Sequence, residues 1–402
     1  MTDEHLGRRI AAYVRTLRHP VNELLAARAD RGLTPREAYT LLHLLRGRMD
    51  PVAGVGFRRG NVDPVTRDPH RLHLPYRDEW FFILGHLKDD RGREFGIQWA
   101  LCRQATGASD ADTPGTHLFC AQLALTEKST RRHRQLEDIC VSGESIHYSS
   151  DPFRVELPGA ECSMHALASR GEDRIQLEMG RGTFIPWRGD GTFALSFGCM
   201  YDLANIDGRG TLTLDGITAS FTGRFWIQHA WLTAALPWLP PGLTTLLRTV
   251  KLHPLRIQWQ WLFAHLDDGA ALCLVRQRND LKCGYVSARG EIQFTKDARL
   301  STLHDAFDPL ANAAVPTDLR VTSAALKLDV EFVPWAANQP VRTPFGVYRE
   351  GAADVRGTKD SRPVTGLGFA EAVGYEDLDT RTRKALALLG LDESHAKDFL
   401  LH

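Results

Sequence analysis

The sequence of 402 residues lacks the marks of several large classes of protein. Its 49 lysines and arginines equal its 49 aspartates and glutamates, so no excess of positive charge favours nucleic acid or an anionic membrane as a partner. The seven cysteines include no Cys-x-x-Cys pair, which favours reduced thiols over a disulfide framework or a zinc site. The 16 histidines form no His-Glu-x-x-His sequence, so we expect no metal.

Long apolar runs and nucleotide-binding motifs are missing as well. No stretch approaches about 18 apolar residues without a break, which predicts no membrane-spanning helix and leaves room only for transient contact with a membrane. The N-terminus has no secretory signal, so we expect a cytoplasmic location. Neither Gly-x-Gly-x-x-Gly after a strand nor a Walker A sequence occurs, and no Gly-x-Ser-x-Gly offers a nucleophile. We therefore expect no cofactor.

Short strands are what the sequence does contain. From Val52 onward, apolar or alternating runs such as 80–87, 95–102 and 211–225 are separated by turns, among them Asp215-Gly216. Regularly spaced short strands joined by Asp-Gly turns are typical of antiparallel barrels or sandwiches. The fold is therefore predicted to be mainly β.

Helices are expected at both ends of the chain. Residues 5–28 carry apolar side chains at mostly three- and four-residue spacing, and Thr34-Pro-Arg-Glu37 is a capping box. The helices could serve as a strut, a dimer contact or a lid. An apolar stretch that three prolines interrupt, 231–250, is interpreted as a buried linker, or as a flap over a cavity or a dimer surface. We divide the chain into an N-terminal helical appendage, a first β domain, this linker, a second β domain and a C-terminal helix: 1–51, 52–230, 231–250, 251–377 and 378–402.

The segment Trp226-Ile-Gln-His-Ala-Trp231 follows a long alternating run. In a strand, alternate residues share a face, which puts Trp226 and Gln228 on one side and His229 and Trp231 on the other. A large aromatic ring beside an amide suits a pocket for a mostly apolar ligand. The alternative is an amphipathic strand whose aromatic residues only pack in a core.

Four motifs occur in a fixed order: Glu79-Trp-Phe-Phe…Gly85-His-Leu87, Gly223…Trp226-Ile-Gln-His-Ala-Trp231, Trp259-Gln-Trp-Leu…Leu266-Asp-Asp-Gly269, and Tyr348-Arg-Glu-Gly…Gly366-Leu-Gly-Phe-Ala-Glu371…Gly374-Tyr375. Together they resemble the lipocalin-like family of carotenoid 1,2-hydratases (hydroxyneurosporene synthases), AttH-type hydrolases and decalin-forming Diels–Alderases. The resemblance implies two tandem lipocalin-like antiparallel β-barrels, with a ligand pocket in or between them.

The resemblance also implies site residues. The candidates for catalysis are Gln228, His229, Gln260, Glu79 and Glu371. The candidates for substrate binding are Trp80, Trp226, Trp231, Trp259, Trp261, Arg276, Tyr201 and Tyr348. Gln228 and Gln260 stand where the family has aspartates, and glutamine can form hydrogen bonds but cannot deliver a proton. The acids that remain near the motifs are Glu79, Asp202, Glu350 and Glu371, of which Glu79 and Glu371 have a structural role as their alternative.

These observations favour an enzyme that needs no cofactor and takes a long, apolar, unsaturated substrate such as a polyene, isoprenoid or polyketide. Amide and imidazole donors in an aromatic pocket favour cyclisation or isomerisation of the pericyclic type. Hydration of a C=C bond, the reaction of a carotenoid hydratase-like lyase, requires instead a buried carboxylic acid with a raised pKa. The alternatives are a non-catalytic carrier of a hydrophobic small molecule and a structural module with a protein interface.

Overall fold

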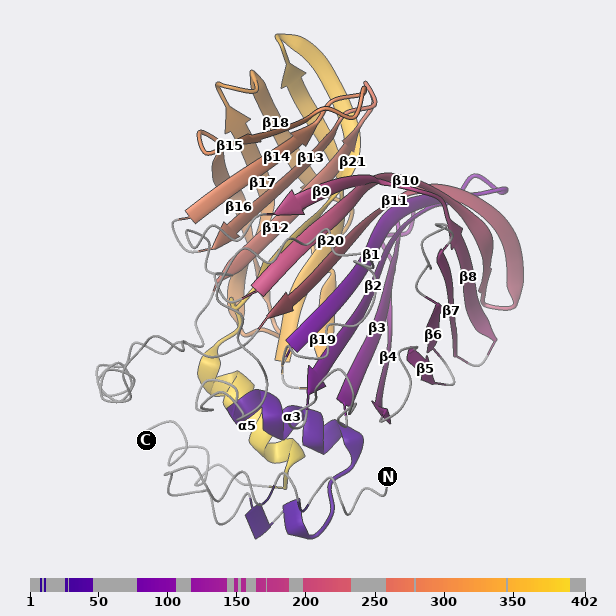
Figure 1. Cartoon of the computed structure of the whole chain (residues 1–402), viewed down its shortest axis with the longest axis vertical. Helices are drawn as coiled ribbons and strands as arrows, with labels where there is room; N and C mark the ends of the chain where they lie inside the picture. The colour runs from indigo at the N-terminus through magenta and orange to yellow at the C-terminus, as the bar shows by residue number, and fades with distance from the viewer. Residues whose placement is uncertain are drawn as a thin grey trace.

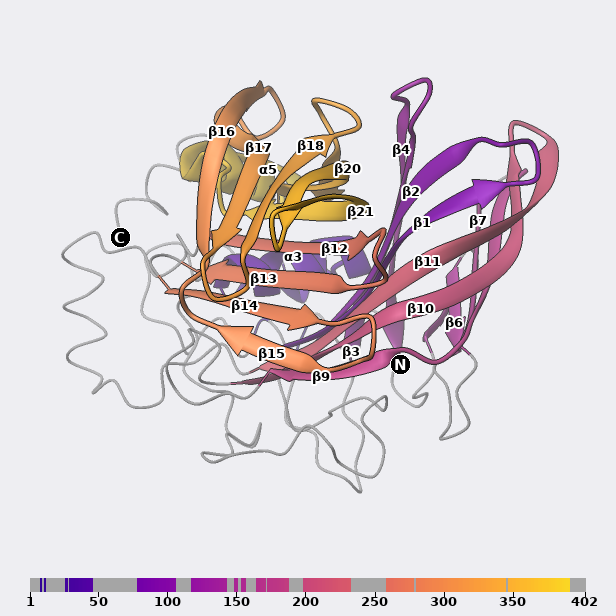
Figure 2. The same ribbon diagram turned by 90° about the horizontal axis from the view of Figure 1, so that it is seen from above.

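The computed structural model describes residues 8, 11, 26–27, 29–45, 78–105, 117–142, 148–150, 153–156, 164–170, 172–187, 198–232, 258–277, 280–344 and 346–390. Within these residues the chain forms two curled antiparallel sheets, which stand beside each other in Figures 1 and 2. The predicted mainly β fold of two lipocalin-like halves is therefore confirmed. Residues 233–250 of the predicted linker 231–250 and most of the appendage 1–51 lie outside the described residues, and the domain boundaries stay predictions.

The first sheet has eleven strands within the described residues, in the order β4-β3-β2-β1-β11-β10-β8-β7-β6-β5, with β9 paired to β10. The strands are β1 (Asp78–Asp89), β2 (Glu94–Ala105), β3 (His117–Glu127), β4 (His133–Ser142), β5 (Tyr148–Ser150), β6 (Phe153–Glu156), β7 (Met164–Arg170), β8 (Asp173–Met179), β9 (Thr183–Trp187), β10 (Gly198–Leu214) and β11 (Ile217–Leu232). Strand β1, the first along the chain, pairs with β2 on one side and with β11, the last strand of this sheet, on the other.

The second sheet has ten strands in the same part of the chain, in the order β15-β14-β13-β12-β21-β20-β18-β17-β16, with β19 paired to β20. They are β12 (Trp259–Leu266), β13 (Ala271–Gln277), β14 (Asp280–Val286), β15 (Ile292–Thr295), β16 (Arg299–Asp308), β17 (Ala313–Ser323), β18 (Leu328–Pro334), β19 (Pro340–Thr343), β20 (Gly346–Lys359) and β21 (Arg362–Val373). Both sheets thus place their first strand next to their last strand, as a curled up-and-down sheet does.

The alternation of side chains divides the apolar interior into three layers. The first-barrel core fills the concave side of the first sheet and includes Phe81, Trp99 and Phe225. The second-barrel core, around Leu262 and Phe332, fills the second sheet. Between them lies a third layer, which we call the seam; its large members are Phe82, Trp187, Trp226, Trp261, Phe263, Trp335 and Phe369, with Trp80 and Trp259 packed at its margin. One sheet face therefore serves each core, and the opposite face serves the seam.

Predicted local signals hold where the structure describes them. The Asp215-Gly216 turn joins β10 to β11 with φ angles of 52° and 76°, the left-handed pair that a tight hairpin requires. Helix α3 (Pro35–Leu45) begins with the expected capping box, in which the Thr34 amide donates to Glu37 Oε2 over 2.8 Å. Figure 1 shows α3 and helix α5 (Leu378–Leu388) packed together at one end of the sheets. No helix among the described residues is both long and apolar enough to span a bilayer.

Candidate active site

Strand β11 presents its side chains as the alternation predicts. Trp226 lies in the seam, and Gln228 on the same face receives a hydrogen bond from Trp80 Nε1 over 3.4 Å. His229 and Trp231 point to the opposite side, where their rings contact each other at a centroid distance of 5.1 Å. The central motif therefore supplies two separate places with polar groups.

The first place is a buried chain of polar groups at the ends of β1, β2, β3, β10 and β11. Glu79 accepts hydrogen bonds on both carboxylate oxygens: Arg103 Nε lies 2.9 Å from Oε2, and His229 Nε2 lies 2.8 Å from Oε1. The other ring nitrogen of His229 faces the Tyr201 hydroxyl at 3.1 Å, and Arg103 Nη1 faces His117 Nδ1 at 3.2 Å. All five side chains are almost fully buried.

An oppositely charged neighbour stabilises the buried carboxyl group of Glu79. The guanidinium of Arg103, 2.9 Å from Glu79, supplies the positive charge that a buried carboxylate needs. Burial, together with the neighbouring Arg103 charge, lowers the pKa of His117 to about 4, which keeps that imidazole neutral. Glu79 thereby orients the His229 ring toward Tyr201, an arrangement able to move a proton.

The second place is a pair of carboxyl groups in the seam. Glu350 on β20 is directly opposite Glu371 on β21, and both are buried, with 2% and 8% of their surface exposed. Trp259 Nε1 donates to Glu371 Oε2 over 2.8 Å. Neither oxygen of Glu350 makes a hydrogen bond within the described residues. Among the described residues, no arginine or lysine forms an ion pair with Glu350 or Glu371. Glu79, by contrast, is paired with Arg103.

The environment of this pair favours carboxylic acids over carboxylates. Burial raises the pKa of Glu371 to about 8, against a smaller opposing effect of the Trp259 hydrogen bond. Burial, and then repulsion by Glu371, raises the pKa of Glu350 well above its ordinary value, which the nearby Gln98 partly offsets. At neutral pH the seam therefore contains protonated carboxyl groups next to aromatic rings.

Neutral polar groups complete the wall of the seam beside this pair. Gln98 Nε2 donates to the Tyr348 hydroxyl over 2.9 Å, and that hydroxyl donates to Gln122 Oε1 over 3.3 Å. These bonds connect β2 and β3 of the first sheet to β20 of the second sheet. They fix the two sheets relative to each other at the position of the carboxyl pair.

A third buried acid, Asp202, lies farther along the seam. Its Oδ2 accepts hydrogen bonds from Trp187 Nε1 at 2.7 Å and from Cys273 Sγ at 3.3 Å, so it links the first sheet to the second. Burial raises the pKa of Asp202 to about 7, an effect that the Trp187 hydrogen bond only partly offsets.

Asp202→Asn is expected to stabilise the protein at alkaline pH. The folded-state pKa of Asp202 exceeds the ordinary value of 3.8, so the folded protein holds this proton more tightly than the unfolded chain. The stability contributed by the group is therefore lost as pH rises from about 4 to about 7, up to a total of about 4 kcal/mol at roughly 1.4 kcal/mol per pKa unit. Urea unfolding at pH 4 and pH 8 tests this: the variant should gain on the wild type at pH 8 only, and an equal difference at both values would contradict it.

The predicted site residues are thus distributed over three places. The seam brings together Glu371, Gln228, Trp80, Trp226, Trp259, Trp261 and Tyr348. The first-barrel side brings together Glu79, His229, Tyr201 and Trp231. Gln260 and Arg276 face the second-barrel core, away from both. Sequence reasoning did not single out Arg103 or Gln98, which are ordinary polar residues within strands, whereas Gln122 stands where the family's histidine was expected.

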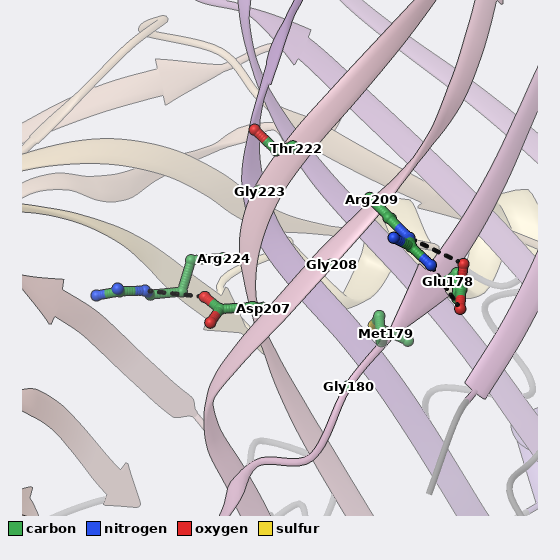
Figure 3. A pocket seen from close by; sticks show the side chains of 9 residues that line it. All are labelled: Glu178, Met179, Gly180, Asp207, Gly208, Arg209, Thr222, Gly223 and Arg224. Carbon is green, nitrogen blue, oxygen red and sulfur yellow. Dashed lines mark hydrogen bonds and ion pairs between the residues drawn. The ribbon is translucent and has the colours of Figure 1, made fainter.

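An open hollow of about 630 Å³ lies elsewhere, over the far parts of β8, β10 and β11 (Figure 3). Its charged groups are paired with one another, Arg209 with Glu178 at 3.1 Å and Arg224 with Asp207 at 3.8 Å. None of the predicted site residues lines it. It is an open depression on the surface of the sheet, and we assign it no catalytic role.

Comparisons with known proteins agree with this architecture. The sequence model of the AttH-like family matches residues 65–375. The solved structure of a protein assigned as an AttH from Nitrosomonas europaea covers 82% of this chain and 100% of its own, with a TM-score of 0.64 and 18% identity. That of kievitone hydratase from Nectria haematococca covers 81% and 95%, with a TM-score of 0.57 and 12% identity.

At these identities the two structures establish the fold alone. A search of curated proteins finds no match. The family match is the stronger finding, because it extends over both sheets and more than half of the sequence. The chain therefore belongs to the AttH-like family.

Proposed function

We propose that the protein is an enzyme that transfers a proton to a carbon–carbon double bond of an apolar substrate held in the seam, and so catalyses hydration. The observation that carries this proposal is the buried pair Glu350–Glu371, two carboxyl groups without a cationic partner among the described residues. The likeness in fold to kievitone hydratase supports the same reaction class.

A protonated carboxyl group is the acid that an isolated alkene requires. Glu371 holds its proton at neutral pH because burial disfavours the carboxylate. In the proposed reaction the Glu371 proton forms a C–H bond with one alkene carbon, and a water oxygen bonds to the other. The water then loses a proton to the carboxylate of the pair, so the net change is the addition of one water molecule.

The aromatic wall suits the charge that develops in this reaction. Trp259 and Trp261 flank the position of Glu371, Trp259 through its hydrogen bond and Trp261 as the directly paired residue on β12. The faces of indole rings attract cations, by roughly 2 kcal/mol or more in a desolvated site. We propose Trp80, Trp226 and Tyr348 as further substrate contacts of the seam.

The chain Glu79–His229–Tyr201 is proposed as a second acid–base group, on the first-barrel side. A cyclisation or isomerisation of the pericyclic type is the second candidate function, favoured by the neutral amides of Gln98, Gln122 and Gln228 along the seam. Such donors can polarise a carbonyl group without transferring a proton.

Isotope labelling separates these functions in one experiment. The purified protein is incubated with kievitone, with a linear isoprenoid polyene and with an unsaturated polyketide, in H₂¹⁸O and separately in D₂O, and the products are analysed by mass spectrometry. Hydration incorporates solvent oxygen and one non-exchangeable deuterium. Isomerisation by protonation incorporates deuterium alone, whereas a pericyclic product carries no label and overturns the proton-transfer proposal. Recovery of unchanged ligand in a stable complex would identify a carrier.

A further inference from the structure

Four strands of the second sheet carry a row of side chains on the face opposite to the seam. Gln260 on β12 is in register with Arg276 on β13 and with Ala372 on β21, and Ala372 is in register with Arg349 on β20. Directly paired residues of antiparallel strands point to the same face, about 5 Å apart. The register therefore places two arginines and one glutamine in a row at the end of the second-barrel core, with the small side chain of Ala372 between Gln260 and Arg349.

Gln260 has unmet hydrogen-bonding capacity in this row. Its side chain is 1% exposed, and neither the amide oxygen nor the amide nitrogen has a hydrogen-bond partner within the described residues. A buried polar group without a partner costs about 1–3 kcal/mol, so such groups call for an explanation. A ligand that accepts a hydrogen bond from the amide nitrogen would provide one.

The guanidinium of Arg349 is likewise buried and only partly hydrogen-bonded. It is 5% exposed, and its Nη1 donates to the Pro316 carbonyl over 2.7 Å. The Nε atom on its other edge is buried without a partner, and no carboxylate in the described ranges lies within ion-pair distance of this guanidinium. Asp308 and Asp318 act on it only from farther away, while burial lowers its pKa to about 10. The group remains a cation at neutral pH.

Arg276 completes the row from the other side. It is half-buried, and its one hydrogen bond within the described residues is a long contact of 3.5 Å from Nη2 to the Tyr375 hydroxyl. Among the described residues, no carboxylate forms an ion pair with Arg276. The row thus combines two cations with an unpaired amide, and among the described residues neither cation forms an ion pair with a carboxylate.

We propose that this row is a binding site for a carboxylate group, separate from the seam. The free Nε and Nη2 edge of Arg349 matches the two oxygens of a carboxylate, a planar pairing that guanidinium groups form in preference to point-charge contacts. The Gln260 amide nitrogen donates to the same group, and Arg276 supplies the second positive charge. Ala311 and Val315 pack against Ala372, so small apolar side chains border the proposed site.

Two ligand sources share this chemistry: a free short carboxylate, and the carboxylate end of a longer apolar acid that extends into the core. Titration calorimetry of the full-length protein with acetate, hexanoate and dodecanoate distinguishes them. Equal affinities identify a free small anion, and affinity that rises with chain length identifies an apolar acid. Hexanamide is the neutral control, and we expect it to bind at least tenfold more weakly than hexanoate.

Two variants place the binding in this row. Gln260→Leu and Arg276→Gln should each weaken carboxylate binding at least tenfold. Gln260→Leu should leave the Tm unchanged or raise it, because it replaces an unpaired buried amide with an apolar group of similar size. Glu371→Gln should leave carboxylate affinity unchanged, which separates this proposal from the proposed function. Absence of carboxylate binding, equal binding of the acid and the amide, or full affinity in both variants would overturn it.

Discussion

Glu371→Gln is expected to reduce turnover by roughly 10²–10⁴-fold, the usual contribution of a positioned general acid. The amide keeps the shape of the carboxyl group and can still accept the hydrogen bond from Trp259 Nε1, but it has no acidic proton to transfer. The rate constant of the labelled reaction, measured by single turnover, reports the effect. Glu291→Gln, at an exposed glutamate of the second half of the chain, is the control and should retain full activity.

Two further measurements separate catalysis by Glu371 from a role in folding. Because the folded-state pKa of Glu371 is raised above its ordinary 4.5, its ionisation destabilises the folded protein at high pH, and the glutamine variant should be at least as stable as the wild type at pH 9. The wild-type rate should be constant near pH 6 and fall as pH rises through about 8, when the acid loses its proton. A pH-independent rate, or an active glutamine variant, would exclude Glu371 as the acid.

Patterns local to one strand or one turn could be predicted from the sequence. The two faces of β11, the hairpin at Asp215-Gly216 and the capping box at Thr34 each depend on residues within a few positions of one another. Period-two alternation decides which side chains share a face, whatever the sheet packs against. These features therefore hold in the structure without knowledge of the rest of the fold.

Pairings between distant positions could not be predicted from local patterns. Glu350 and Glu371 are both acids of the last motif, but their direct pairing depends on a turn at Asp360-Ser361. Both turn residues have positive φ, 52° and 62°, at a position where glycine would have made the hairpin recognisable. With that turn located, counting back along both strands would have placed the two carboxyl groups side by side.

The sequence also could not show how the faces of two sheets are divided among three layers. Gln228 and Gln260 have the same position in two similar motifs, each beside tryptophan, and were expected to serve one pocket. The second sheet packs on the first through the face that carries Trp261, so Gln260 points into the second-barrel core while Gln228 points into the seam. Which face of a sheet is inside depends on the packing of the whole sheet and not on its local pattern.

The partner of Glu79 is the feature with the largest expected effect on stability. Arg103→Met should lower the free energy of unfolding by roughly 3–5 kcal/mol, because it leaves a buried carboxylate without its guanidinium while preserving most of the side-chain volume. His229 stays within hydrogen-bond distance of Glu79 in this variant. Urea unfolding at pH 7 measures the change.

Arg209→Met is the matched control, because Arg209 pairs with Glu178 at 3.1 Å, close to the 2.9 Å of the buried pair, but at the surface. Water solvates the glutamate that this variant leaves behind, so its effect should be much smaller. Adding Glu79→Gln to Arg103→Met removes the unpaired charge and should restore part of the lost stability. Equal losses in the two single variants, or no recovery in the double variant, would mean that side-chain packing and not the burial of charge determines the stability of this end of the first sheet.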